Sequence, residues 1–203
     1  MARFPSLLFV VFFLTRATPQ LVRAQIPPPD VQIAAAVQAA PEALRNGAAV
    51  LGFEATGSLV ILRPGENHLV CLADDPSNEG FSVACYHKSL EPYMARGGEL
   101  RAQGISDGQE RNGIRWEEAT KGTLKMPEEP ATLFVLTGSG FDTETEEVSG
   151  AYLRYVVYTP WATVESTGLP DRPQGPGSPW LMFPGTPGAH IMISPPPPAG
   201  GRR

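Results

Sequence analysis

The stretch HLVCLADDPSNEGFSVACYH, residues 68–87, decides the fold, because two β-forming segments flank a polar loop there. It contains both cysteines of the chain and two of its three histidines. If the stretch folds symmetrically around Asn78, Cys71 and Cys85 are opposed on an antiparallel hairpin, close enough for a disulfide at a non-hydrogen-bonded position. We therefore predict a Cys71–Cys85 disulfide, which closes a loop of about 15 residues.

The same stretch contains the ligand types of a tetrahedral zinc site, two thiolates and two imidazoles. On a strand, however, His68 and Cys71 point to opposite faces unless a bulge intervenes, while Cys85 and His87 share a face. The spacing also departs from the C-x₂₋₄-C and H-x₃₋₅-H patterns of structural zinc sites. Free thiols and zinc are the alternatives to the disulfide, and no metal or other cofactor is predicted.

The first residues form a segment of their own. Arg3 precedes an unbroken apolar run, LLFVVFFL at 7–14. Such a run rises only about 12 Å as a helix, whereas a bilayer core is about 30 Å thick. We predict that residues 1–24 are a secretory signal peptide, cleaved after Ala24 or alternatively after Ala17, and that no transmembrane anchor is left after cleavage.

Export to the periplasm or the cell exterior follows from this signal, and both are oxidising surroundings that preserve disulfides. Cleavage changes the net charge from −5 to −8, because residues 1–24 contain three arginines and no acid. A protein of this charge without a longer basic cluster than Arg202-Arg203 repels a phosphate backbone. Nucleic acid is therefore not an expected partner, and the sequence does not specify which ligand or protein is.

The remaining chain predicts one α+β domain over residues 30–194. A proline-rich tether at 25–29 precedes it, and a proline-rich tail at 195–203, predicted to be disordered, follows it.

The domain is predicted to contain a mainly antiparallel sheet with helices on one side. Helical spacing of apolar residues covers 30–46, with an interruption at Pro41, and a second helical region covers 89–121. The first four strand candidates predict a meander, and the next two predict a hairpin. The strand candidates are 48–53, 58–63, 68–73, 81–86, 131–137, 151–159 and 189–194.

Candidate catalytic residues are few. The chain lacks G-x-S-x-G, and the predicted disulfide occupies both cysteines, so histidines are the remaining groups that ordinarily titrate near neutral pH. His87 lies where a strand passes into a helix, with Glu91 one turn further on, and His190 lies on the last strand. They support the hypothesis of a small hydrolase-like or metal-assisted enzyme. The alternative is structural: His87 beside a helix cap at Ser89, and His190 on a partly solvated strand face.

The leading hypothesis is a non-catalytic binding or interaction module. The segment 160–183 is dense in Pro and Gly but contains Trp161 and Trp180, two large side chains suited to anchoring a ligand. Arg154 alternates with tyrosines on its strand, an arrangement that binds carboxylates or stacks on rings. The aromatic Pro/Gly loop is therefore the predicted recognition surface, and the sequence identifies neither its ligand nor the oligomeric state.

Overall fold

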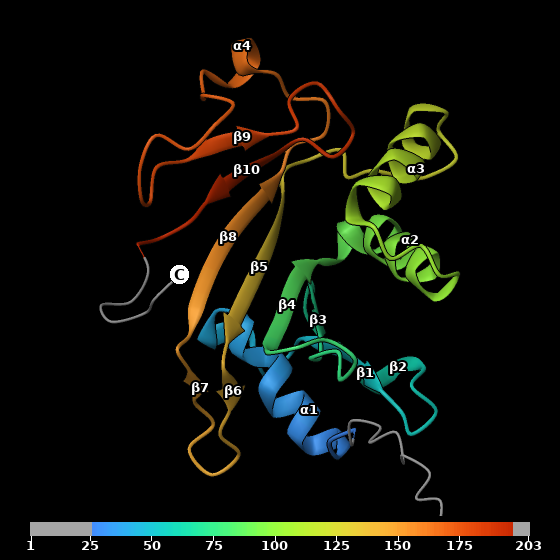
Figure 1. Cartoon of the computed structure of the whole chain (residues 1–203), viewed down its shortest axis with the longest axis vertical. Coiled ribbons are helices and arrows are strands. Elements are labelled where there is room, and N and C mark those ends of the chain that lie inside the picture. Colours follow the sequence, from blue (N-terminus) through green and yellow to red (C-terminus); the bar gives the residue numbers. More distant parts are fainter. Residues whose placement is uncertain (1–25, 197–203) are drawn as a thin grey trace, which may run out of the picture.

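The computed structural model describes residues 26–196, so the predicted signal peptide and most of the predicted tail lie outside the described residues. Within that range an eight-stranded sheet has the order β2-β1-β3-β4-β5-β8-β10-β9 (Figure 1). Every neighbouring pair is antiparallel except β1 and β3, which confirms the predicted α+β class. The strands are β1 (Ala49–Phe53), β2 (Leu59–Arg63), β3 (Leu69–Leu72), β4 (Phe81–His87), β5 (Ala131–Gly138), β8 (Tyr152–Tyr158), β9 (Trp180–Met182) and β10 (His190–Ile193).

All seven predicted strand segments form strands, and the predicted hairpin is the pair β5–β8. A short ribbon, β6 (Gly140–Phe141) with β7 (Val148–Ser149), extends that hairpin. The predicted meander is wrong at one connection, because β2 lies at the sheet edge and β3 pairs in parallel with the other side of β1. This pairing places Val50 beside Cys71, both fully buried, whereas Ile61 on β2 is 69% exposed.

Cys71 and Cys85 form the predicted disulfide. They are opposed on β3 and β4, with their Cα atoms 4.0 Å apart, and both are fully buried. Cys85 Sγ lies 3.4 Å from the carbonyl oxygen of Ala36, so the cross-link is in contact with the N-terminal helical segment.

That segment consists of α1 (Pro29–Ala36) and two 3-10 turns, η1 (Val37–Ala39) and η2 (Glu42–Leu44). The predicted interruption at Pro41 is confirmed, because η2 begins directly after it. Gln32 joins α1 to β1: its side chain donates to Phe53 O at 2.9 Å and accepts from Phe53 N–H at 2.8 Å. A buried amide satisfied in this way fixes the helix against the sheet.

The helices contact opposite faces of the sheet, which corrects the prediction that they cover one side. Val83 and Cys85 of β4 pack with α1 and η1, whereas Ala84 and Tyr86 pack with the region of α2 (Glu91–Ala102) and α3 (Gly108–Thr120). In Figure 1, α2 and α3 lie together beside the sheet, apart from α1. The reason is that β4 is apolar at successive positions, so both of its faces require cover.

We expect the disulfide to stabilise the hairpin strongly. Replacing Cys71→Ala together with Cys85→Ala should lower the free energy of unfolding by about 3 kcal/mol, because the open chain regains loop entropy. Urea unfolding followed by circular dichroism measures this difference, with fully reduced wild type as the second comparison. A loss below about 1 kcal/mol in both would show that packing alone holds β3 against β4.

Candidate functional site

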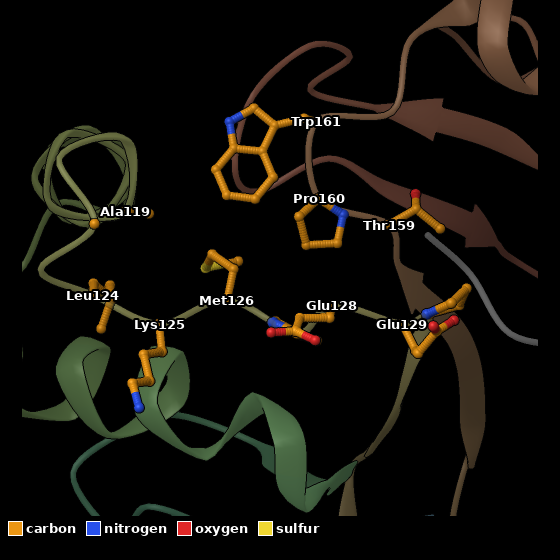
Figure 2. A pocket seen from close by; sticks show the side chains of 12 residues that line it. Ala119, Leu124, Lys125, Met126, Glu128, Glu129, Thr159, Pro160 and Trp161 are labelled. Atoms are coloured by element: carbon orange, nitrogen blue, oxygen red, sulfur yellow. The ribbon is translucent and has the colours of Figure 1, made fainter.

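A segment without regular secondary structure, residues 125–130, separates two surface grooves. On one side is a groove of about 600 Å³ between the end of α3 and the end of β8, which we call the Trp161 groove (Figure 2). On the other side is a groove of about 490 Å³ bordered by the β4–α2 junction, which we call the His87 groove. Because 125–130 lines both, the two grooves adjoin each other.

Trp161 is the most distinctive residue of the first groove. Trp161 is 47% exposed, and its backbone has φ +60°, in the left-handed region that bulky residues rarely adopt. Hydrogen bonds hold this conformation: Trp161 N–H donates to Thr186 O at 2.8 Å, and Ala162 N–H donates to Thr159 O at 3.0 Å. Backbone strain of this kind costs about 1–3 kcal/mol, so the contacts of the surrounding loop must hold Trp161 in this conformation and thereby position its indole.

The opposite wall of the Trp161 groove carries charge. Glu128 and Glu129 are both exposed, and neither forms an ion pair with another residue of the range 26–196. Lys125 also lines the groove, but Figure 2 shows its side chain pointing away from Trp161. In Figure 2 the side chain of Met126 points toward the indole, so the groove combines apolar lining with two carboxylates on the same segment.

The other binding residues predicted from sequence lie elsewhere. Trp180 is half-buried on β9, opposite Met192 of β10, and is not among the residues lining either groove. Arg154 lies in the middle of β8, opposite Val135 of β5. Its Nε is buried and has no hydrogen-bond partner among the described residues. The structure therefore does not bring Trp161, Trp180 and Arg154 into one site.

His190 is an interior residue, 8% exposed, which corrects the prediction of a partly solvated strand face. His190 belongs to a ring of aromatic side chains in which contacting neighbours have centroids 5.0–5.7 Å apart. The other members come from β8, α2, α3 and the loop before β10. One link of the set is a hydrogen bond of 3.1 Å from the Trp116 indole to the Tyr93 hydroxyl. We call this set the aromatic cluster: His190, Tyr158, Tyr93, Trp116 and Phe183.

The environment of His190 fixes its protonation state. Nδ1 lies 2.7 Å from the carbonyl oxygen of Gly188, so Nδ1 carries a proton and donates it. Burial lowers the pKa of His190, and the bond to Gly188 only partly opposes that effect. A neutral imidazole among aromatic rings has a packing role here, and His190 lines neither groove.

His87 borders its own groove and has local partners. Its Nδ1 lies 2.8 Å from Ser89 Oγ and also accepts from Ser89 N–H at 3.3 Å, so the imidazole itself caps the turn that precedes α2. Partial burial, together with His68 and Lys88, lowers the pKa of His87. The sequence analysis assigned the cap to Ser89, whereas the structure shows that the His87 imidazole is the cap and Ser89 its partner. A histidine two residues before a serine is the signal in the sequence that could have indicated this.

The three proposed catalytic side chains are engaged separately. The Glu91 carboxylate accepts a hydrogen bond of 2.6 Å from Tyr86, while His190 lies in the aromatic cluster. His87 remains with Ser89, and its ring lies 5.3 Å from that of His68. The contacts therefore give no combined site of His87, Glu91 and His190.

Metal ligation was the alternative for the hairpin. The disulfide removes both thiolates from any ligand set, and no group of three or more His, Cys, Asp and Glu side chains in residues 26–196 is placed to hold a metal ion.

Within residues 26–196, no helix has the length and apolar character needed to cross a membrane. Comparisons with protein families, with curated proteins and with solved structures found no match.

We expect His190 to make stability depend on pH. Its folded-state pKa lies below the unfolded value of about 6.5, so its contribution is complete above that pH and is lost as the pH falls through the folded pKa. Wild type should lose more stability between pH 7.5 and 5 than His190→Asn, whose amide can still donate to Gly188 O. Urea titrations at both pH values measure this.

The exposed His68 supplies the control: its replacement in His68→Asn removes its effect on the pKa of His87 but leaves His190 buried, so this variant should still lose stability with falling pH, unlike His190→Asn. Identical pH profiles for wild type and His190→Asn would contradict the role assigned to His190.

Proposed function

We propose that this protein is an exported, non-catalytic binding module whose recognition surface is the Trp161 groove. The observation that carries the proposal is the exposed indole of Trp161, held in a strained backbone conformation at the edge of a groove. A strained residue persists only where the surrounding fold holds it in place, and such residues cluster at ligand-binding positions. The buried disulfide is compatible with an oxidising location outside the cytoplasm.

The walls of the groove are fixed, which supports binding by a preformed surface. Thr159 N–H donates to Ala189 O at 2.9 Å, which joins the end of β8 to the loop before β10. On the other wall, Pro127 is buried, so segment 125–130 is attached to the body of the protein. A preformed groove of about 600 Å³ falls within the range that accommodates small ligands or several residues of a peptide.

We expect ligands of the groove to act on Trp161 specifically. A panel of neutral oligosaccharides, acidic and basic tripeptides and alkylammonium salts can be titrated while the indole N–H signals of the three tryptophans are followed by NMR. At least one class should shift the Trp161 signal without shifting that of Trp116. Trp161→Ala should then weaken that ligand by about tenfold or more, as expected for loss of an aromatic anchor.

Trp180→Phe is the matched control, since Trp180 does not line the groove and its replacement should leave the affinity unchanged. If every class up to 10 mM leaves the Trp161 signal in place, the binding function is wrong.

A second candidate function, hydrolysis, is favoured by one contact. A serine hydroxyl 2.8 Å from a neutral imidazole beside a groove is the start of a nucleophile–base pair. Within the described residues, however, no carboxylate hydrogen-bonds to His87, and such a third group normally orients the base. The contact with the Ser89 N–H is that of a turn cap, so hydrolysis ranks second.

Labelling by a fluorophosphonate separates the two functions. For a binding module we expect no adduct on Ser89 and turnover of p-nitrophenyl acetate at the level of His87→Ala. Ser82→Ala, at an exposed serine of β4, controls for non-specific reaction. A stoichiometric adduct on Ser89 that His87→Ala abolishes would establish the hydrolase and refute a purely binding role.

A further inference from the structure

We infer that the Trp161 groove recognises an organic cation, an alkylammonium or guanidinium group of the kind that ends a lysine or arginine side chain. The inference rests on the binding function proposed above and specifies its ligand class. It follows from three properties of the groove: a free aromatic face, unpaired carboxylates and an apolar lining.

The first property is the indole of Trp161. Tryptophan binds cations most strongly of the aromatic side chains, through attraction of the charge to the ring face. Trp116 has other partners, because its Nε1 donates to Tyr93 and its ring packs on Phe183. Trp161, by contrast, is 47% exposed at the groove. The protein already uses such a contact internally, with Arg115 Cζ 3.9 Å from the centroid of the Tyr93 ring.

The second property is the sign of the charge. Glu128 and Glu129 line the groove, while the ammonium group of Lys125 points away from the indole in Figure 2. Because neither carboxylate has an ion-pair partner in the described part of the chain, their field acts on whatever enters. Anionic ligands are repelled, and cationic ones gain both a carboxylate and an aromatic contact.

The third property separates an organic cation from a metal ion. Leu124, Met126 and Pro160 line the groove between its polar groups, and they offer apolar contact to the methylenes of a ligand. A divalent metal ion requires several converging oxygen or nitrogen ligands, and the two glutamates adjoin in sequence without a third His, Cys, Asp or Glu placed beside them in residues 26–196. The surface therefore fits a charged group on a hydrocarbon stem.

The test uses matched probes on the protein purified after full-length expression. N-acetyl-lysine-methylamide and tetramethylammonium are the cationic probes, and N-acetyl-norleucine-methylamide is the neutral counterpart of the first. Following the Trp161 indole by NMR, we expect both cations to bind at least about fivefold more tightly than the neutral probe, and added salt to weaken them. Trp161→Leu should abolish the shift at the remaining groove resonances.

Charge variants test the role of the carboxylates. Glu128→Gln with Glu129→Gln should weaken both cations by about threefold or more, as loss of an exposed electrostatic attraction predicts. The matched control is Glu146→Gln with Glu147→Gln, an exposed adjacent pair on the β6–β7 loop, which should leave affinity unchanged.

The outcomes separate the inference from the function on which it rests. Equal binding of the lysine and norleucine probes, or unchanged cation affinity in the Glu128/Glu129 variant, would overturn the inference that the ligand is a cation. Either result would leave the groove a binding site. Cation binding that survives Trp161→Leu would place the cation elsewhere and also overturn the inference. If neither these probes nor the wider panel shifts Trp161, the binding function itself fails.

Discussion

The register of β3 against β4 is the constraint on which the remaining structure depends. The disulfide fixes Cys85 opposite Cys71, and strand alternation then assigns every other residue of β4 to a face. A slip of one residue would turn Tyr86 toward α1 and remove it from Leu90 and Tyr93. Because each face of β4 is covered by different helices, a slipped side chain would lose its apolar partners on one face without gaining equivalent partners on the other. The cross-link therefore fixes the positions of both helical layers.

That register is carried to the Trp161 groove through aromatic contacts. Tyr86 hydrogen-bonds to Glu91 at the start of α2, and Arg96 forms an ion pair of 2.7 Å with Glu118 that joins α2 to α3. From these helices the aromatic cluster extends to β8, β10 and the loop before β10. Gly188 is part of this fit, because a Cβ there would lie 2.3 Å from Trp116 Nε1. The wall that bears Trp161 is thus positioned by packing between elements distant in sequence.

Local information predicted the strands and the disulfide, because apolar alternation and a symmetric polar loop are properties of short segments. It could not predict that β3 passes to the inner side of β1, since β2 and β3 are both apolar and either can pair there. To predict that the helices lie on opposite faces of the sheet, one would need to know that Ala84 and Tyr86 are covered by helices as well as Val83 and Cys85. Trp161 was predicted as an anchor from composition, but its backbone strain and the carboxylates across the groove arise from tertiary contacts. Burial of His190 has the same origin, in rings supplied by four other segments.

Packing accounts for Tyr158 and Phe183 of the C-terminal region but not for Trp161. Phe183 also has a positive φ, 56°, but its ring packs between Trp116 and His190 and so contributes to the interior. Trp161 bears comparable backbone strain while nearly half of its surface faces solvent. An alanine or glycine at position 161 would allow the same turn hydrogen bonds with less exposed apolar surface, and glycine would also relieve the strain. The hydrogen bonds of the surrounding loop must therefore offset the strain at Trp161, and the proposed binding role gives a reason for a bulky, exposed side chain at this position.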